Sequence, residues 1–366
     1  MVKRLNIFFS IITSVSCIFF VSSCNILVSD RKDENRIELT RTKFSELLGW
    51  KNASYSGALS SFLKSCTRFD SLRDNFNLGF PAGNVGKWRE VCSKARQTKK
   101  GEERKFFSKN FTPYLASENG NNQGLFTGYY ELELEGSRKK YEEYKYPIYK
   151  RPPEMSKPFL GRRRIGNGEL TGRGLEIAYV KDPVELFFLH IQGSGRVRLE
   201  NGKTLKVGYD DQNGCPYVSI GKYLADSGEL IKEEITAQKI KDWLRSNPKK
   251  ARQVMDKNMS YVFFREMSGY DSPVGGQGVS LTPEHSLAID KRFIPYGVPL
   301  WLDTTLPAEG NKPEKPYRNL LIAQDTGGAI KGGVRGDIFF GHGKRASTLA
   351  GNMKQAGKYY LLLPTE

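Results

Sequence analysis

Short apolar segments separated by turn residues make up most of the chain after residue 124, and this pattern constrains the fold more than any other feature. The segment 124–137, "GLFTGYYELELEGS", ends in strict alternation of apolar and polar residues, which is typical of a half-buried strand. Asn201-Gly202 stands between two alternating segments and indicates a tight hairpin. Because long helices do not regularly separate these strands, the pattern favours barrels over a doubly wound parallel sheet.

The predicted elements alternate between helical and strand-rich blocks. Helical spacing of apolar residues predicts packing helices within residues 42–92, and the stretch 175–210 is interpreted as successive strands. Helices return in 236–258, where Thr236 is a suitable N-cap and Pro248 opens a second helix. After residue 260 the strand-like segments are "YVFFRE", "VPLWLDT", "NLLIAQD", "DIFFG" and "YYLLLP". A chain of 366 residues with 38% hydrophobic content has room for about two folded domains.

The N-terminus has the pattern of an export signal. Two basic residues, Lys3 and Arg4, precede an apolar run that is too short and wrongly flanked for a spanning helix. The run ends in "VSSC", which resembles the bacterial lipobox and predicts lipidation of Cys24; an ordinary signal peptide with a stray cysteine is the alternative. Asn25, rather than Asp, follows this cysteine, which indicates an outer-membrane lipoprotein that faces the periplasm of a Gram-negative bacterium.

The charge and the cysteines agree with an exported protein. The formal net charge is +17, and removal of the signal lowers it by two, which predicts attraction to polyanions. For an exported lipoprotein these are the anionic cell wall and lipid head groups, and nucleic acid is not an expected partner. Cys66 and Cys92 are expected to form a disulfide, with two buried thiols as the alternative. The spacing of cysteines and histidines predicts no metal site, and no cofactor is expected.

The glycine-rich stretch "LIAQDTGGAIKGGVRGDIFFGHG", residues 321–343, contains two misleading short motifs. Asp325-Thr326-Gly327 is the triplet of aspartic proteases, but that chemistry needs two such loops sharing one proton, and this chain has one. Arg335-Gly336-Asp337 is an adhesion tripeptide, but it leads directly into a strand that is expected to be buried. The sequence therefore indicates neither an aspartic protease nor an adhesion motif.

A set of motifs in a fixed order carries a resemblance to a known family. The motifs are "GLFTGYYE", "LHIQGSGRV", "YDDQNGCPYVSIGKYL", "SYVFFRE", "GVSLTPEHSLAIDKRFIPYGVPLWLDT" and "AQDTGGAIKGGVRGDIFFG". From about residue 124 to 364 the chain resembles the membrane-bound lytic murein transglycosylase A family, outer-membrane lipoproteins that cut peptidoglycan. The resemblance implies a mainly β fold with N-terminal helices: a double-psi β-barrel domain, a smaller inserted β-barrel domain, and a deep groove between them.

The same resemblance sets the expected domain limits. They are a lipoprotein signal peptide at 1–23, a tether at 24–40, N-terminal helices that complete the main domain at 41–125, an inserted β-barrel domain with short helices at 126–257, and the double-psi catalytic part at 258–366.

The resemblance places the catalytic acid at Asp337, and Asp325 and Asp290 match two supporting aspartates. Each of these two aspartates also has a structural alternative. Asp325 could only bond the backbone of the Gly327-Gly328 turn, and Asp290 could only order the barrel through Arg292 or backbone groups. The candidate substrate-binding residues offer aromatic rings, hydroxyls, an amide, a glycine turn or a charge suited to sugars and muropeptide carboxylates; they are Thr127, Tyr129, Tyr130, Gln192, Gly193, Ser194, Tyr217, Tyr261 and Lys331.

The implied reaction needs only one carboxyl group. A lytic transglycosylase cleaves the β-1,4 bond between N-acetylmuramic acid and N-acetylglucosamine, with the C6 hydroxyl of the substrate as nucleophile and 1,6-anhydromuramyl ends as products. One carboxyl can then act first as acid and later as base. Two alternatives are a two-carboxylate hydrolase, using Asp337 with Asp290 or Asp325, and a non-catalytic peptidoglycan-binding lipoprotein. The expected partners are glycan strands, outer-membrane lipid through Cys24 and proteins of wall remodelling, and the chain is expected to be a monomer.

Overall fold

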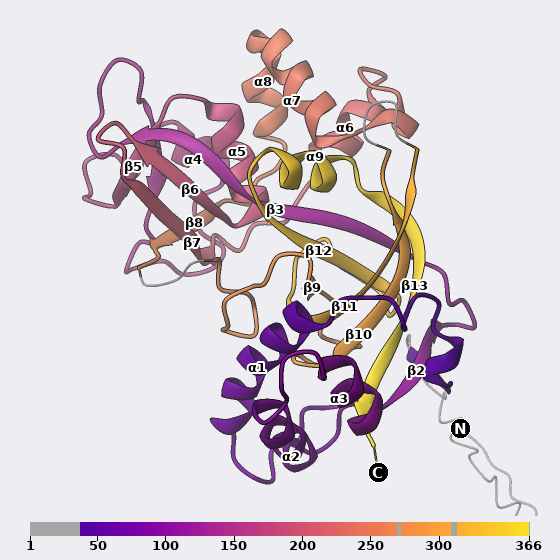
Figure 1. Cartoon of the computed structure of the whole chain (residues 1–366). Helices are drawn as coiled ribbons and strands as arrows, with labels where there is room; N and C mark the ends of the chain where they lie inside the picture. The colour runs from indigo at the N-terminus through magenta and orange to yellow at the C-terminus, as the bar shows by residue number, and fades with distance from the viewer. Residues whose placement is uncertain (1–36, 269–271, 309–312, 366) are drawn as a thin grey trace, which may run out of the picture. The chain divides into compact units, whose positions relative to one another are not determined.

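Six strands follow one another in a closed ring of hydrogen-bonded pairs (Figure 1). The order is β13, β10, β11, β9, β12 and β3, and β3 pairs back to β13. In the computed structural model, which describes residues 37–268, 272–308 and 313–365, the ring strands are β3 (Gly124–Ser137), β9 (Ser286–Ala288), β10 (Pro299–Leu306), β11 (Lys315–Asp325), β12 (Arg335–His342) and β13 (Lys354–Pro364). The predicted mainly β class is confirmed, and the double-psi connectivity stays a prediction.

Apolar side chains cover both faces of the central strands of this ring. Strand β10 carries "PLWLDTTL", and its first four residues are all buried. Leu300 of β10 lies opposite Leu321 of β11 and Leu361 of β13, whereas Trp301 points to the other face and packs against the rings of Trp50 and Tyr55. Burial of side chains of this size stabilises a fold by about 1.5–3 kcal/mol each. The predicted strands in the second β block are therefore held by a continuous apolar core.

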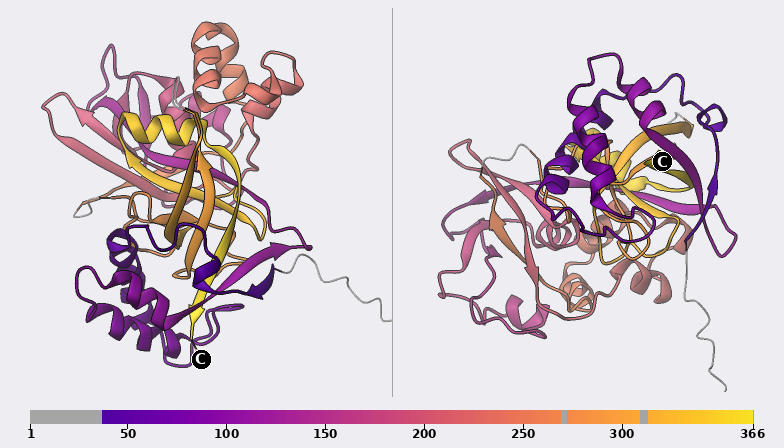
Figure 2. Two further views of the ribbon diagram at one scale, coloured as in Figure 1. Left: turned by 45° about the vertical axis from the view of Figure 1, so that its right-hand side comes forward. Right: turned by 90° about the horizontal axis from the view of Figure 1, so that it is seen from below.

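The N-terminal segments add three helices and two strands to the ring. Strand β2 (Phe111–Glu118) pairs with β13, and β1 (Ile37–Arg41) pairs with β2. The helices α1 (Ser56–Asp70), α2 (Val85–Arg96) and α3 (Glu103–Asn110) lie together beside these strands, and a short 3-10 turn, η1 (Phe44–Glu46), precedes them (Figure 2). A disulfide between Cys66 and Cys92 links α1 to α2.

Two features of this region differ from the sequence-based expectation. The tether is predicted at 24–40. Residues 37–41 nevertheless form a strand, because the backbone groups of all five residues pair with β2. Strand β2 itself was not predicted, since "FTPYLASE" contains Pro113 and lacks clean alternation.

A second group of strands is attached through the far half of β3. Residues 124–131 of β3 pair within the ring, while 132–137 pair with β6 and β5. The remaining strands of this group are β4 (Tyr146–Tyr149), β5 (Glu176–Val180), β6 (Ser194–Leu199), β7 (Thr204–Gln212) and β8 (Val262–Glu266). Because β8 pairs with β7, the predicted boundary at 257/258 lies too early, and residues 262–266 belong with the second group. The predicted hairpin at Asn201-Gly202 joins β6 to β7.

The prediction of continuous strands across 175–210 is wrong for its middle part. Residues Pro183–Gln192 form the helix α5, whose N-cap Asp182 accepts hydrogen bonds from the backbone N–H groups of Val184 and Glu185. Gly193 ends the helix with a positive φ of 76°. The segment "VELFFLH" is apolar on almost every side because α5 is buried, so periodicity could not separate it from a buried strand.

The other helices are short and lie mostly in the segment between the two β blocks. Thr236 caps α7 as predicted, accepting from the backbone N–H of Lys239, and Pro248 begins α8. These elements are α4 (Arg162–Gly166), α6 (Ile220–Asp226), η2 (Lys232–Glu234), α7 (Ala237–Ser246), α8 (Pro248–Met255) and α9 (Lys344–Asn352). Within the described ranges, every helix is too short or too polar to cross a membrane. The predicted signal, Cys24 and most of the tether lie outside the described residues.

Candidate active site

The short strand β9 brings Asp325 and Asp337 to the same level of the ring. Ala288 of β9 pairs with Asp325 of β11 on one side and with Asp337 of β12 on the other. Asp337 is also opposite Thr127 of β3, and Phe339 is opposite Tyr129. Since side chains two residues apart in a strand share a face, Thr127, Tyr129, Asp337 and Phe339 lie on one face of the β3–β12 pair.

Two side chains order the carboxyl group of Asp337: the neutral Thr127, which bonds it directly, and the positively charged Arg335, which bonds Thr127. The hydroxyl of Thr127 donates a hydrogen bond of 2.6 Å to Oδ1 of Asp337. The guanidinium of Arg335 donates to the same hydroxyl oxygen at 2.8 Å, so Arg335 fixes the direction in which Thr127 donates. Asp337, taken as a whole residue, is partly exposed, as is Asp325.

Asp325 is fully occupied with structural hydrogen bonds. Its Oδ1 accepts from the backbone N–H groups of Gly276 at 2.9 Å and Thr326 at 2.8 Å, and its Oδ2 accepts from the hydroxyl of Tyr129 at 2.7 Å. The Tyr129 ring also contacts Phe339, with ring centroids 5.3 Å apart. Through these bonds Asp325 holds the Gly276 loop, the turn at Thr326 and the Tyr129 side chain in place at the site.

The surroundings favour the neutral form of both carboxyl groups. The pKa of Asp337 is raised from 3.8 to about 6, mainly by burial and to a small extent by the charge of Asp325, against the lowering effects of the Thr127 hydrogen bond and the Arg335 charge. Burial also raises the pKa of Asp325, against the lowering effect of its three hydrogen bonds. Burial and the Asp325 carboxylate hold the pKa of Tyr129 well above its usual range, so Tyr129 remains a hydrogen-bond donor. A carboxyl with a pKa near 6 can supply a proton close to neutral pH.

Gly128, which lies between Thr127 and Tyr129 in β3, allows the close packing around the site. A Cβ atom on Gly128 would lie 2.5 Å from the ring of Phe340 and 2.9 Å from the backbone of Ala350 in α9. Any larger residue would therefore push β3 away from β12 and α9, and Thr127 away from Asp337. This contact explains why glycine separates Thr127 from Tyr129 in "FTGYY".

Arg335 is a site residue that the sequence reasoning missed. It was noticed only as part of the adhesion tripeptide, although its place two residues before Asp337 in one strand puts both on the same face. Besides Thr127, Arg335 donates to the carbonyl oxygens of Leu125 and Gly336, so it also holds the start of β3 against β12. Strand periodicity alone could have identified it.

Asp290 lies in a separate cluster and makes no hydrogen bond or ion pair with Asp337 among the described residues. Its buried carboxylate accepts from the Arg292 guanidinium at 2.6 Å and from the backbone N–H of Gly332 at 3.0 Å. It therefore links the segment after β9 to the glycine-rich loop. These contacts fit the structural alternative, an ordering role through Arg292, and the convergence of Asp290 on the acid stays a prediction.

We expect Asp290→Asn to destabilise the fold in a pH-dependent way. Burial alone would raise the pKa of Asp290, but the hydrogen bonds from Arg292 and Gly332 lower it to about 2. The ionised form therefore stabilises the fold above the unfolded pKa of 3.8, and this contribution disappears as the pH falls through 2. Since Arg292 is largely exposed, we expect the variant to lose about 1–2 kcal/mol at pH 7. Urea unfolding at pH 7 and near pH 2.5 measures this; an equal loss at both pH values would contradict it.

The remaining predicted substrate residues are spread over several parts of the fold. Tyr130 and Gln192 lie together, since the backbone N–H of Tyr130 donates to Oε1 of Gln192 at 3.1 Å. Gly193 caps α5 and Ser194 is buried in β6, so both have structural roles here. Tyr217 and Lys331 are exposed. Tyr261 is buried and lines a cavity, with His190 and Arg162.

Comparison with known protein families decides the relationship. Residues 125–265 match the family model described as the MltA specific insert domain, and residues 285–363 match the 3D domain model. The chain belongs to the membrane-bound lytic murein transglycosylase A family. The matched insert covers Thr127 and Tyr129, and the 3D domain covers Asp325 and Asp337, so the candidate site is built from both matched regions.

Individual relatives agree with this assignment. The chain is 35% identical to membrane-bound lytic murein transglycosylase A of Vibrio cholerae over 66% of this chain and 67% of the relative. It is also similar to the crystal structure of MltA from Neisseria gonorrhoeae, with a TM-score of 0.76, 34% identity and coverage of 90% of this chain and 93% of that one. An Escherichia coli MltA structure with bound chitohexaose is 26% identical, with a TM-score of 0.67 and coverage of 84% and 90%. The predicted family and the predicted enzyme class, a peptidoglycan lytic transglycosylase, are confirmed.

No group of three or more potential metal-ligating side chains occurs in the described part of the chain.

Proposed function

We propose that this family member cleaves the β-1,4 bond between N-acetylmuramic acid and N-acetylglucosamine without water, with Asp337 as the single acid and base. The observation that carries the proposal is the difference between the two neighbouring carboxyl groups. Asp337 accepts a single side-chain hydrogen bond, and its pKa is raised to about 6. Asp325 accepts three hydrogen bonds, which occupy both of its oxygens.

The proposed reaction moves two protons in turn through one carboxyl group. Neutral Asp337 donates its proton to the glycosidic oxygen while the bond from C1 of N-acetylmuramic acid to that oxygen breaks. The C6 hydroxyl of the same sugar then attacks C1, and the Asp337 carboxylate takes the hydroxyl proton. The enzyme returns to its starting state, and the product ends in a 1,6-anhydro ring. The attack is intramolecular, so it has a high effective concentration and needs no second carboxylate.

The two alternatives are less well supported by these contacts. A two-carboxylate hydrolase needs a second carboxylate free to attack C1 or to activate water. Asp325 would have to give up its bond to Tyr129 or to two backbone N–H groups, and Asp290 is bonded to Arg292 and Gly332. A non-catalytic binding protein has no use for a carboxyl group whose charged form is disfavoured.

Counting reducing ends during lysis of murein sacculi tests the proposal. The purified protein should clear the suspension while the number of new reducing ends stays at background, since each cut closes a ring instead of adding water. One new reducing end for each bond broken would instead identify a hydrolase, and an unchanged suspension would favour the binding protein.

We expect activity to decrease as pH rises above about 6. Because the pKa of Asp337 is raised, its proton-donating form is complete below this value and is lost above it. The rate on short glycan strands at limiting substrate should fall by about tenfold per pH unit above pH 7. A rate independent of pH between 5 and 8, measured where circular dichroism shows no unfolding, would contradict the assignment of Asp337 as the acid.

The proposed location follows from the N-terminal sequence. The lipobox and Asn25 favour an outer-membrane lipoprotein anchored through Cys24 and facing the periplasm, with glycan strands as the substrate. Tyr130, Gln192, Tyr217 and Lys331 are proposed to contact the glycan or its peptides in a groove between two β domains. A Cys24→Ala variant should no longer incorporate labelled fatty acid, and it should separate from the membrane fraction.

A further inference from the structure

A cavity lies entirely within the region matched by the insert model. It has a volume of about 860 Å³, which is within the usual range for ligand sites, and it contains none of the three aspartates discussed above. Its walls come from β4, β5, α4, α5 and the α7–α8 pair. Five aromatic side chains line it: Tyr146, Tyr149, Tyr179, Phe187 and Tyr261.

A buried arginine lines this cavity, and no carboxylate lies within ion-pair distance of it among the residues described. Arg162 is 8% exposed, and its guanidinium donates to the backbone oxygens of Asn258 and Ser260 and to Nδ1 of His190. Three of its five N–H donors are used in this way. Asp256 contributes an attractive charge but makes its ion pairs with Arg163 and Arg252. A buried charge without a paired ion is costly, and a bound anion would remove that cost.

The neighbouring histidine has a hydrogen-bond donor with no partner. Arginine can only donate, so Nδ1 of His190 accepts from Arg162 at 2.8 Å, and the proton of the neutral ring is on Nε2. That Nε2 atom is buried and has no hydrogen-bond partner among the described residues. Burial and the charge of Arg162 hold the pKa of His190 well below its usual range, which keeps the ring neutral. His190 is 6% exposed and lines the same cavity.

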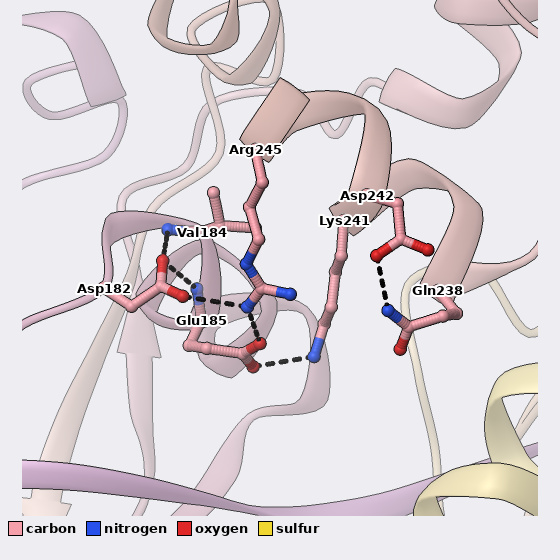
Figure 3. A network of polar contacts seen from close by, with 7 residues as sticks. All are labelled: Asp182, Val184, Glu185, Gln238, Lys241, Asp242 and Arg245. Atoms are coloured by element: carbon pink, nitrogen blue, oxygen red, sulfur yellow. Dashed lines mark hydrogen bonds and ion pairs between the residues drawn. The ribbon is translucent and has the colours of Figure 1, made fainter. Parts of the chain in front are cut away.

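The other charges around the cavity are partly neutralised. The lining includes six basic side chains and three acidic ones (Lys140, Lys145, Arg162, Lys181, Arg245 and Arg252 against Glu176, Asp182 and Asp256), and three of the basic ones, Lys181, Arg245 and Arg252, form ion pairs with carboxylates. Arg245 of α7 is held by Asp182 and Glu185 at the start of α5, as Figure 3 shows. That network fixes one wall of the cavity and leaves Arg162 as its buried cation.

We propose that this cavity binds a carboxylate group of a short acidic peptide, with Arg162 and His190 as the recognition pair. Resting on the proposed function, the peptide is the stem carried by peptidoglycan, whose carboxylates match the planar guanidinium and whose side chains fit the aromatic walls. The cavity then holds the wall through its peptides, while the Asp337 site acts on its sugars.

Calorimetric titration of the full-length protein in detergent tests this, with purified stem peptide as the probe. Amidation of the peptide carboxylates should weaken binding by about tenfold or more, because each lost charged hydrogen bond costs about that factor. Arg162→Gln should weaken binding of the unmodified peptide similarly, and His190→Phe should weaken it less. Arg163→Gln, which changes the exposed neighbour, is the matched control and should bind like the wild type.

Two comparisons separate this inference from the proposed function. Asp337→Asn should bind the stem peptide normally while losing lytic activity, and Arg162→Gln should still cleave glycan strands from which the peptides have been removed. The inference is overturned if amidated and free peptides bind equally to the unaltered protein, if no binding occurs at millimolar peptide, or if Asp337→Asn abolishes peptide binding. The first two results do not depend on any variant folding correctly.

Discussion

Replacement of Asp337 by Asn should reduce the rate of murein lysis by about 10³–10⁴-fold. A positioned acid or base contributes about 10²–10⁴-fold, and here one group has both roles, so its loss should be near the upper end. The amide has nearly the same shape as the carboxyl and can still accept the hydrogen bond from Thr127. Turbidity loss of sacculi, followed over hours to detect the residual rate, measures the effect.

The same variant should be slightly more stable than the wild type above pH 6. Burial disfavours the ionised form of Asp337, so ionisation destabilises the fold as pH rises from 3.8 through 6. The neutral amide avoids this penalty of about 1–3 kcal/mol. Asp226→Asn, an exposed aspartate paired with Lys222, is the matched control and should change neither activity nor stability. A fully active Asp337→Asn protein would show that the acid lies elsewhere.

Replacement of Asp325 by Ala should lower activity by about 10²-fold and destabilise the fold by about 1–3 kcal/mol. The change leaves the part-buried Tyr129 hydroxyl without its acceptor, and an unsatisfied donor of this kind costs about that much, whereas water can bond the two exposed backbone N–H groups. Tyr129 and the Gly276 segment would then lose their positions beside Asp337. Urea unfolding and the rate on short glycan strands measure the two effects.

The pH profile of Asp325→Ala separates a structural role from an electrostatic one. The charge of Asp325 is the smallest of the influences on the pKa of Asp337, so the decline in activity near pH 6 should move little while the maximum rate falls. A move of this decline by more than about one pH unit toward acid would instead assign Asp325 an electrostatic role. Tyr129→Phe, which removes only the hydroxyl, should lose about tenfold in rate and keep the profile.

The sequence was most informative where periodicity and capping gave independent signals. The second β block, the Asn201-Gly202 hairpin and the helix after Thr236 follow from alternation, turn chemistry and an N-cap. Prediction failed at α5, since a helix buried on nearly all sides has no polar face to reveal its period. It also failed at β1, a short polar edge strand that exists only because β2 offers a partner.

The candidate site could be predicted only where sequence neighbours become spatial neighbours. Asp325 and Asp337 were identified through their glycine-rich motif, but their relation through Ala288 depends on the pairing of β9 with two strands. Tyr261 was expected at the sugar site. It packs instead against His190 in the cavity of the insert region, with ring centroids 4.2 Å apart. No local pattern links Arg162, His190 and Tyr261, which come from three separate segments, so only the folded structure brings them together.

The masses of the muropeptides released from murein sacculi test the central claim most directly. The purified wild-type protein should release fragments that end in 1,6-anhydromuramic acid, lighter by one water than the products of hydrolysis. Asp337→Asn under the same conditions should release almost none. Fragments that carry the mass of the added water, released by the wild type in proportion to lysis, would contradict the single-carboxyl mechanism.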